Sequence, residues 1–398
     1  MPRSEGHSLL SRRSFLQAST AASAALALRI VTEPMLAYAK RPPAPAGSVM
    51  IDSNENTLGP CEAAREAVAA IIPQSGRYLD PLTDQLIKQL AQDFGVTEDH
   101  IRVFAGSSEP LHYTVMAFTS SKASYVTADP GFESGAHAAK NVGARVVNVP
   151  LTKSYAHDVR AMLAAAPDAG VFYVCTPNNP TGTLTSLSDI EYLVENKPKN
   201  SIVLVDEAYI HFSDSPSAID LVKAGKDVVL LRTFSKIYGM AGLRCGVAVG
   251  RPDLVQKVQS YGGGNPMPVT AVVAASASLK DPNLIAERKR INAEIRSATF
   301  GWLERNGYFY IPSVSNCFMV ETKRPAHDVI AAMAQQKVVI GRVWPSTPTY
   351  IRITVGTREE MEKFQVAFQH VMTGKVTARL QPNEKLKRRS IDGFVLPG

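Results

Sequence analysis

Short, nearly uninterrupted apolar runs recur between residues 100 and 250, and longer segments with helical spacing separate them. Runs of Val, Ile and Leu without polar alternation are typical of strands buried on both faces, as in parallel sheets covered by helices. Seven runs are predicted as strands: 101–104, 124–127, 145–149, 171–175, 202–205, 228–231 and 245–249. The pattern therefore predicts an α/β fold with three layers, in which a mainly parallel seven-stranded sheet lies between helices.

The pattern changes near residue 270. A long charged helix is predicted over about 283–305, followed by a strand at 316–320, a helix near 326–336 and a strand at 350–355. These elements predict a smaller α+β domain behind the large one. The expected organisation is a linker and arm at 40–75, a large domain at 76–275, a small domain at 276–372 and a basic tail at 373–398.

The first 39 residues have the three parts of a secretory signal. Arg12 and Arg13 precede an apolar stretch at 18–28, and Ala37-Tyr38-Ala39 supplies a cleavage site. The stretch is too short to span a bilayer, so no stable membrane anchor is expected. The alternative, an Ala-rich first helix of the fold, is disfavoured by the prolines that follow it. Because the paired arginines resemble the twin-arginine type, we expect a periplasmic or secreted protein that the twin-arginine translocase exports folded.

Charge and cysteine content exclude several classes of function. The formal charge is +7, of which residues 1–39 carry +2 and residues 375–389 carry +5, so the rest is neutral overall. A neutral body disfavours nucleic-acid binding, and the basic tail is interpreted as a solvated end, with a membrane or acidic-partner contact as the alternative. The four cysteines are dispersed and no HExxH motif occurs, so no metal site is expected.

Polar residues with chemical potential follow the predicted strands, and in open parallel sheets ligands bind at the carboxyl ends of the strands. Asp206 follows a wholly apolar strand, where a carboxylate requires a cation or donors. Farther on, Lys236 supplies an amine that can condense with a carbonyl. It lies among Thr233, Ser235 and Arg244, which together form a candidate phosphate cradle.

Two further strand ends, and the one that carries Asp206, add hydrogen-bonding groups. Ser107 and Ser108 begin a predicted helix, whose free N–H groups suit a phosphate. Asn179 lies in a turn made rigid by two prolines, and Tyr209 follows Asp206 by three residues. Neither a Walker A loop nor a GxGxxG turn after a strand occurs, which excludes the common nucleotide loops. A lysine, a buried acid, donors and a phosphate pocket are what pyridoxal 5'-phosphate requires.

Five ordered motifs carry a resemblance to a known family. They lie at 54–60 (NENTLGP), 177–182 (PNNPTG), 205–210 (VDEAYI), 232–244 (RTFSKIYGMAGLR) and 352–357 (RITVGT). From about residue 50 to about 370 the chain resembles the fold-type I aminotransferases of class I/II, most closely the histidinol-phosphate aminotransferase group. The implied activity is ping-pong transfer of an amino group between an amino acid, or an amino-phosphate compound such as histidinol phosphate, and a 2-oxo acid.

The resemblance also implies roles for individual residues. Lys236 would bind the aldehyde and move the substrate proton, and Asp206 would keep the pyridine nitrogen protonated. The phenolate oxygen, the phosphate and the ring face would be bound by the following residues: Asn179, Tyr209, Thr233, Ser235, Arg244, Ser107, Ser108 and Phe132. Tyr78 would reach the phosphate of a neighbouring subunit, which implies a homodimer with shared active sites. On the substrate side, Arg352 would bind the carboxylate together with Asn56, and Arg342 is a candidate for a second acidic group, with a surface role as its alternative.

Two other functions stay open at this point. The same scaffold supports other pyridoxal phosphate reactions, such as decarboxylation in threonine-phosphate decarboxylases, cyclisation or elimination. A non-catalytic protein that binds pyridoxal phosphate is the second alternative, although it would have no use for the Lys236 amine.

Overall fold

The computed structural model describes residues 44–374, and within this range the residues from Val49 to Gly374 belong to one compact unit. The predicted export signal at 1–39, and residues 375–398 of the predicted tail, lie outside the described residues. Within residues 44–374, no helix combines the length and apolar character needed to cross a membrane.

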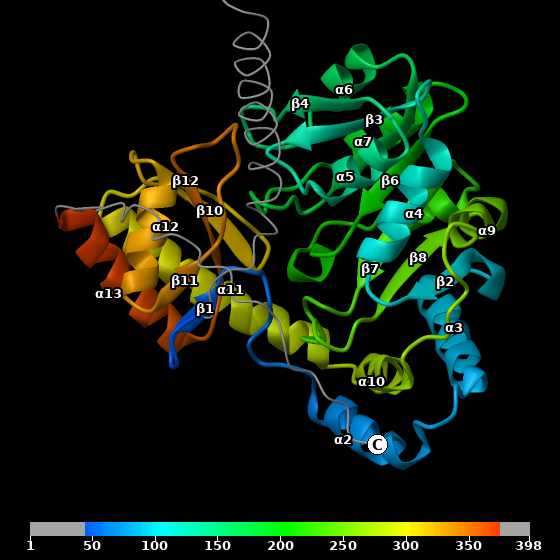
Figure 1. Ribbon diagram of the computed structural model, residues 1–398, viewed down its shortest axis with the longest axis horizontal. Helices are drawn as coiled ribbons and strands as arrows, with labels where there is room; N and C mark the ends of the chain where they lie inside the picture. Colours follow the sequence, from blue (N-terminus) through cyan, green and yellow to red (C-terminus); the bar gives the residue numbers. More distant parts are fainter. Residues whose placement is uncertain (1–43, 375–398) are drawn as a thin grey trace, which may run out of the picture. The chain divides into compact units, whose positions relative to one another are not determined.

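A seven-stranded sheet forms the centre of the larger part (Figure 1). Its strands are β2 (Ile101–Phe104), β3 (Ser124–Asp129), β4 (Val146–Pro150), β5 (Ala169–Cys175), β6 (Ile202–Asp206), β7 (Val228–Thr233) and β8 (Gly246–Gly250). Their order in the sheet is β2-β8-β7-β6-β5-β3-β4. All seven predicted strands are confirmed, with ends that differ by at most two residues. The sheet is mainly parallel, and only β8 runs antiparallel to its two neighbours.

The apolar runs become strands because both faces of the sheet are covered. Every residue of β5, β6 and β8 is buried, so these strands have no solvent-facing side that would need polar alternation. The helices of this part are α2 (Glu62–Ile71), α3 (Asp80–Phe94), α4 (Ser108–Phe118), α5 (Ser134–Asn141), α6 (Val159–Ala165), α7 (Leu187–Asn196), α8 (Ile219–Lys223), α9 (Pro252–Gln259) and α10 (Val269–Leu279). Helix α4 contacts the central strands from β5 to β8, and α7 packs against β6.

A second hydrophobic core organises the C-terminal part. Its strands are β9 (Tyr310–Ile311), β10 (Cys317–Glu321), β11 (Val338–Ile340) and β12 (Tyr350–Thr354), and its helices are α11 (Leu284–Arg305), α12 (Ala326–Gln335) and α13 (Arg358–Thr373). Strand β10 pairs antiparallel with β12 and β9. Strand β1 (Val49–Ile51) pairs parallel with β11, so the segment predicted as an arm contributes a strand to this part. The predicted strands and helices between 283 and 355 are confirmed.

The direction of β8 decides which loops meet. Because β8 is antiparallel to β2 and β7, its first residues lie at the edge of the sheet where the other strands end. The segments after β2, β5, β6 and β7 and the segment before β8 therefore converge. Arg244, which precedes β8, is brought to the same edge as Lys236, which follows β7.

Candidate active site

Lys236 lies in the loop after β7 with its amine turned toward the N-terminal segment. Its Nζ donates to the main-chain oxygen of Asn54 at 2.9 Å and lies 5.6 Å from the ring centroid of Tyr209. Burial, followed by the nearby Arg352 guanidinium, lowers the pKa of Lys236 to about 8. About a tenth of the amine is therefore neutral at pH 7, far more than for an ordinary lysine, and the neutral form is the one that acts as a nucleophile or base.

Asp206 ends β6 and is 4% exposed. Its Oδ2 accepts from the Tyr173 hydroxyl at 2.8 Å, and its Oδ1 accepts from the Ala208 N–H at 3.0 Å. Burial raises the pKa of this carboxyl, while the two hydrogen bonds and Lys236 lower it. Each oxygen keeps capacity for one more donor, which fits a protonated ring nitrogen. The sequence analysis missed Tyr173, although a tyrosine in a fully buried strand needs a partner for its hydroxyl.

The groups expected to bind the phosphate meet between the end of β2 and the start of β8, where Arg244 lies against Gly106 and Gly246 lies against Ser107. Gly106 has a φ of +92°, and a Cβ built on it would lie 2.2 Å from Nη2 of Arg244. A Cβ on Gly246 would lie 2.3 Å from the main-chain nitrogen of Ser107. Glycine at both positions thus lets the guanidinium and the β8 backbone approach the start of α4. Ser107 caps this helix without a side-chain hydrogen bond, so its first N–H groups have no side-chain cap.

Two hydroxyls complete the cradle. The Thr233 hydroxyl donates to Ser235 Oγ at 3.0 Å, and it accepts from the Ser235 main-chain N–H at 3.1 Å. N–H groups at a helix start, hydroxyls and a guanidinium together form a donor set that suits a phosphate dianion. Ser107, Ser108, Thr233, Ser235 and Arg244 thus fit the phosphate of the expected cofactor.

The donors expected for the phenolate oxygen lie between Lys236 and β12. Tyr209 is buried, which raises its pKa, so its hydroxyl stays protonated and able to donate. Asn54 Nδ2 donates to that hydroxyl at 3.1 Å. Asn179 is 6% exposed and accepts from Arg352 through Oδ1, which leaves its amide N–H groups for another acceptor.

Arg352 is the residue whose partners are incomplete. It lies within β12 and is 5% exposed. Nη1 donates to Asn179 Oδ1 at 2.9 Å and Nη2 donates to the Asp52 main-chain oxygen at 2.5 Å. Nε is buried and has no hydrogen-bond partner. A buried donor without an acceptor is costly, and a bound carboxylate would satisfy it.

The remaining predicted residues lie in different settings. Phe132 is half-buried after β3, and Tyr78 is 75% exposed before α3, so the shared site stays a prediction. The Asn56 side-chain amide makes two hydrogen bonds to main-chain groups. Its Nδ2 donates to the Ile237 oxygen, and its Oδ1 accepts from the Leu58 N–H. Arg342 forms an ion pair with Glu133 at 2.6 Å. Substrate contact by Asn56 and Arg342 stays a prediction.

Asn54 is a residue that the sequence analysis did not single out. Its φ is 53°, in the left-handed region that Asn tolerates better than most residues. Its main-chain oxygen accepts from Lys236 Nζ and, at 3.1 Å, from Asn316 Nδ2. Its side-chain Nδ2 donates to Cys317 Sγ at 3.2 Å as well as to Tyr209. Asn54 therefore links the lysine, Tyr209 and β10. Asn54 is the first residue of the 54–60 motif, and this position in the sequence could have identified it as a site residue.

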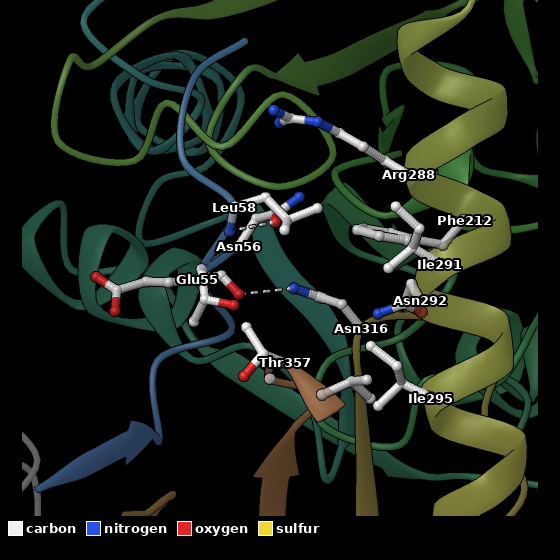
Figure 2. Close-up of a pocket in the computed structure, with 13 residues that line it drawn as sticks. Glu55, Asn56, Leu58, Phe212, Arg288, Ile291, Asn292, Ile295, Asn316 and Thr357 are labelled. Atoms are coloured by element: carbon white, nitrogen blue, oxygen red, sulfur yellow. Dashed lines mark hydrogen bonds between the residues drawn. The ribbon is translucent and has the colours of Figure 1, made fainter. Parts of the chain in front are cut away.

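A pocket lies beside this site (Figure 2). It is lined by the segment Glu55–Leu58, by Ile291, Asn292 and Ile295 of α11, and by Asn316. Figure 2 shows the Asn316 amide bonded to the main-chain oxygen of Glu55, at 3.3 Å. Lys236 is not among the lining residues, so the pocket borders the lysine site through the 54–56 backbone. Among residues 44–374, no three His, Cys, Asp or Glu side chains are placed to bind a metal ion.

Comparisons with known proteins agree with this geometry. The profile of the family described as aminotransferase class I and II matches residues 48–368. Histidinol-phosphate aminotransferase from Moorella thermoacetica is 31% identical over 81% of this chain and 85% of its own length. Aromatic amino acid aminotransferase from Cutibacterium acnes is 33% identical over 82% of this chain and 93% of its own length.

A solved structure adds the cofactor. Histidinol-phosphate aminotransferase from Sinorhizobium meliloti in complex with pyridoxal-5'-phosphate is similar, with a TM-score of 0.76, 25% identity, and coverage of 82% of this chain and 90% of that one. Other pyridoxal phosphate reactions and a non-catalytic binder are not favoured by these relatives. The chain belongs to the class I and II aminotransferases and is a pyridoxal phosphate-dependent transaminase.

Proposed function

We propose that this transaminase exchanges the amino group of an α-amino acid with a 2-oxo acid, and that Arg352 binds the carboxylate of both. The observation that carries the proposal is the buried, unpartnered Nε of Arg352, in a side chain already oriented by Asn179 and Asp52. A carboxylate bound there would be the missing acceptor for Nε.

Pyridoxal phosphate, when bound, supplies an electron sink for negative charge at the substrate Cα. Asp206, kept in place by Tyr173 and Ala208, would hold a proton on the ring nitrogen. Asn179 and Tyr209 would donate to the phenolic oxygen. Lys236, with a pKa of about 8, would accept the Cα proton on Nζ as a neutral amine.

The ion pair of Arg342 with Glu133 supports a donor whose side chain is not acidic. Glu133 already neutralises the arginine that was the candidate for a second acidic group. Together with Arg352, this arrangement suits a substrate with a single anionic group. The names of the relatives supply two donors of that kind, aromatic amino acids and histidinol phosphate.

A donor screen on the purified holoenzyme tests the proposal. L-phenylalanine, L-tyrosine, L-glutamate and L-histidinol phosphate are each supplied with pyruvate, a 2-oxo acid with one carboxylate, and the alanine formed and the bound pyridoxamine phosphate are measured. We expect turnover with an aromatic amino acid and a KM that rises about 100-fold in Arg352→Gln, as loss of a charge-assisted bidentate contact predicts. The matched control is Arg324→Gln, because the Arg324 side chain donates to two main-chain oxygens in the last turn of α13, Val371 and Met372. Turnover with histidinol phosphate and with no amino acid would overturn the proposal.

Borohydride reduction of the holoenzyme checks the lysine separately. Peptide mapping is expected to find the pyridoxyl group on Lys236, and in the Lys236→Ala variant on no residue. A label on another lysine would exclude the assigned site.

A homodimer with shared active sites is part of the proposal. The 75% exposure of Tyr78, a large side chain with apolar surface, supports a role across a subunit interface. Tyr78→Ala and Lys236→Ala are each expected to be inactive. Unfolded together and refolded as a mixture, they are expected to regain activity, because mixed dimers contain one intact shared site. No recovery would contradict shared sites.

Export through the twin-arginine route is the remaining part, supported by Arg12, Arg13 and the A-x-A sequence at 37–39. Fractionation of cells is expected to find the mature chain in the periplasm or the medium. Replacing both arginines by lysine is expected to leave the precursor in the cytoplasm. Unchanged export of the double variant would contradict this route.

A further inference from the structure

Two segments, one of which carries the predicted cofactor-binding residue Phe132, are joined by three side-chain bonds in a regular register. Arg342 pairs with Glu133 at 2.6 Å, Trp344 Nε1 donates to the Gly131 oxygen at 2.8 Å, and Ser346 Oγ donates to Asp129 Oδ1 at 2.6 Å. Every second residue of one segment meets every second residue of the other in reverse order. We call this arrangement of 342–346 along 129–133 the clasp.

Trp344 is the central residue of the clasp and is 1% exposed. Two guanidinium groups lie near its ring, with the Arg342 carbon 4.9 Å and the Arg352 carbon 5.5 Å from the ring centroid. Attraction between a guanidinium and an indole face is strongest where water is excluded. Because Arg352 is itself buried, the ring restricts where its guanidinium can lie.

Gly341 confines Arg352 further. Its N–H donates to the Arg352 main-chain oxygen at 2.9 Å, and a Cβ built on Gly341 would lie 3.1 Å from Arg352 Nε. The Arg352 side chain thus packs against Trp344 and against the Gly341 backbone. Its two Nη atoms are used by Asn179 and Asp52, so the orientation of Nε is fixed from several directions.

The other end of Trp344 reaches the loop after β3. Its indole N–H binds the oxygen of Gly131, the residue before Phe132. Gly131 has no room for a side chain, because a Cβ there would lie 2.4 Å from the Ala128 oxygen. One side chain therefore contacts both Arg352 and the tightly packed backbone that carries Phe132.

We propose that Trp344 is a positioning residue that orients Arg352 for the substrate carboxylate and, through the clasp, fixes the loop that carries Phe132. The inference rests on the proposed carboxylate-binding role of Arg352. Trp344 touches neither substrate nor cofactor in this arrangement and acts through its two neighbours.

Trp344→Leu and Trp344→Phe separate the two contacts. Leucine removes the aromatic face and the N–H, whereas phenylalanine keeps a face for the guanidinium and loses only the N–H. We expect KM for the amino acid to rise about tenfold in Trp344→Leu and by no more than about threefold in Trp344→Phe. KM for the matching amine that lacks the carboxylate is expected to stay the same in both. A purely structural role would change both KM values alike or lower only the active fraction.

A binding measurement on the apoenzyme gives a readout independent of turnover. The chain contains two tryptophans, so Trp302→Phe leaves Trp344 as the only one. In that background, the 2-oxo acid is expected to shift Trp344 emission, and the shift is expected to disappear in Trp302→Phe/Arg352→Gln. Trp302→Leu is the matched control for kinetics, because Trp302 packs on Tyr308 and Phe368.

The outcomes distinguish this inference from the proposed function. If Arg352→Gln raises KM for the amino acid and Trp344→Leu does not, the positioning role is wrong and the carboxylate site stands. If neither variant raises it, the carboxylate site itself is wrong, and the inference fails with it. Equal effects of Trp344→Leu on the amino acid and on the amine also overturn the inference.

Discussion

Replacing Glu207 by glutamine removes one charge from a buried ion pair next to the site. Glu207 is 1% exposed, and its Oε2 accepts from Arg232 Nε at 2.7 Å. Its Oε1 accepts from the Ala218 N–H at 2.7 Å, and both oxygens accept from the Ser217 hydroxyl. Glu207 follows Asp206, and Arg232 precedes Thr233, so the pair ties together the two strands that carry the acid and the phosphate cradle.

The structure sets the size of the effect. The glutamine side chain keeps one oxygen, which can accept from the Ala218 N–H, but its NH2 group faces Arg232, so two donors meet and the arginine loses its acceptor. The other partners of Arg232 supply no charge. Nη2 donates to the Ser217 hydroxyl at 3.0 Å, and Nη1 donates at 2.9 Å to His211, which is neutral because burial and the guanidinium lower its pKa to about 3. Removing one partner of a buried pair costs about 3–5 kcal/mol. We expect Glu207→Gln to lose about 3 kcal/mol of unfolding free energy.

The assay is urea unfolding of the apoenzyme for Glu207→Gln, Arg232→Met and the double variant. The double variant is expected to lose less than the sum of the singles, with a coupling of about 2 kcal/mol, because the second substitution removes the stranded charge. Glu359→Gln is the matched control, since Glu359 pairs with Lys363 on the exposed surface of α13, where solvent screens the pair, and the unfolding free energy is expected to stay nearly unchanged. A loss below about 1 kcal/mol for Glu207→Gln, or strict additivity, would refute the reasoning.

Three other predictions follow from single features. Because the pKa of Lys236 is lowered to about 8, the folded protein releases this proton near pH 8. The rate at which the apoenzyme captures the cofactor is therefore expected to rise with pH and to level off above about pH 8. A rise that continues beyond about pH 10 would contradict this. Gly106→Ala is expected to displace the Arg244 guanidinium and to raise the cofactor dissociation constant about tenfold or more, as measured by fluorescence titration. Gly143→Ala is the control, because Gly143 also has a positive φ but has no neighbour within 4 Å, and it is expected to leave the dissociation constant unchanged. Thr357→Ala removes the capping box of α13 and is expected to lower the unfolding free energy by about 1 kcal/mol, measured by urea unfolding. An unchanged urea midpoint would contradict this prediction.

The sequence by itself determined the strands and the residues that follow them. Strands buried on both faces need apolar side chains at every position, so β5, β6 and β7 could be located from composition alone. The ends of neighbouring parallel strands must meet at one edge, and this rule is enough to place Asp206 and Lys236 close together. The export signal and the domain boundaries stay predictions.

The tertiary structure alone decided the partners of Asn54, Arg352 and Trp344. Strand β1 pairs with β11 across nearly the whole chain, and this pairing brings Asn54 to the Lys236 amine. Nothing in local periodicity specifies which distant segment a three-residue strand will join, because the choice depends on side-chain packing over the whole core. The clasp has the same origin, since its two segments are separated by about 200 residues and are matched only by the shape and charge of the folded surfaces that carry them.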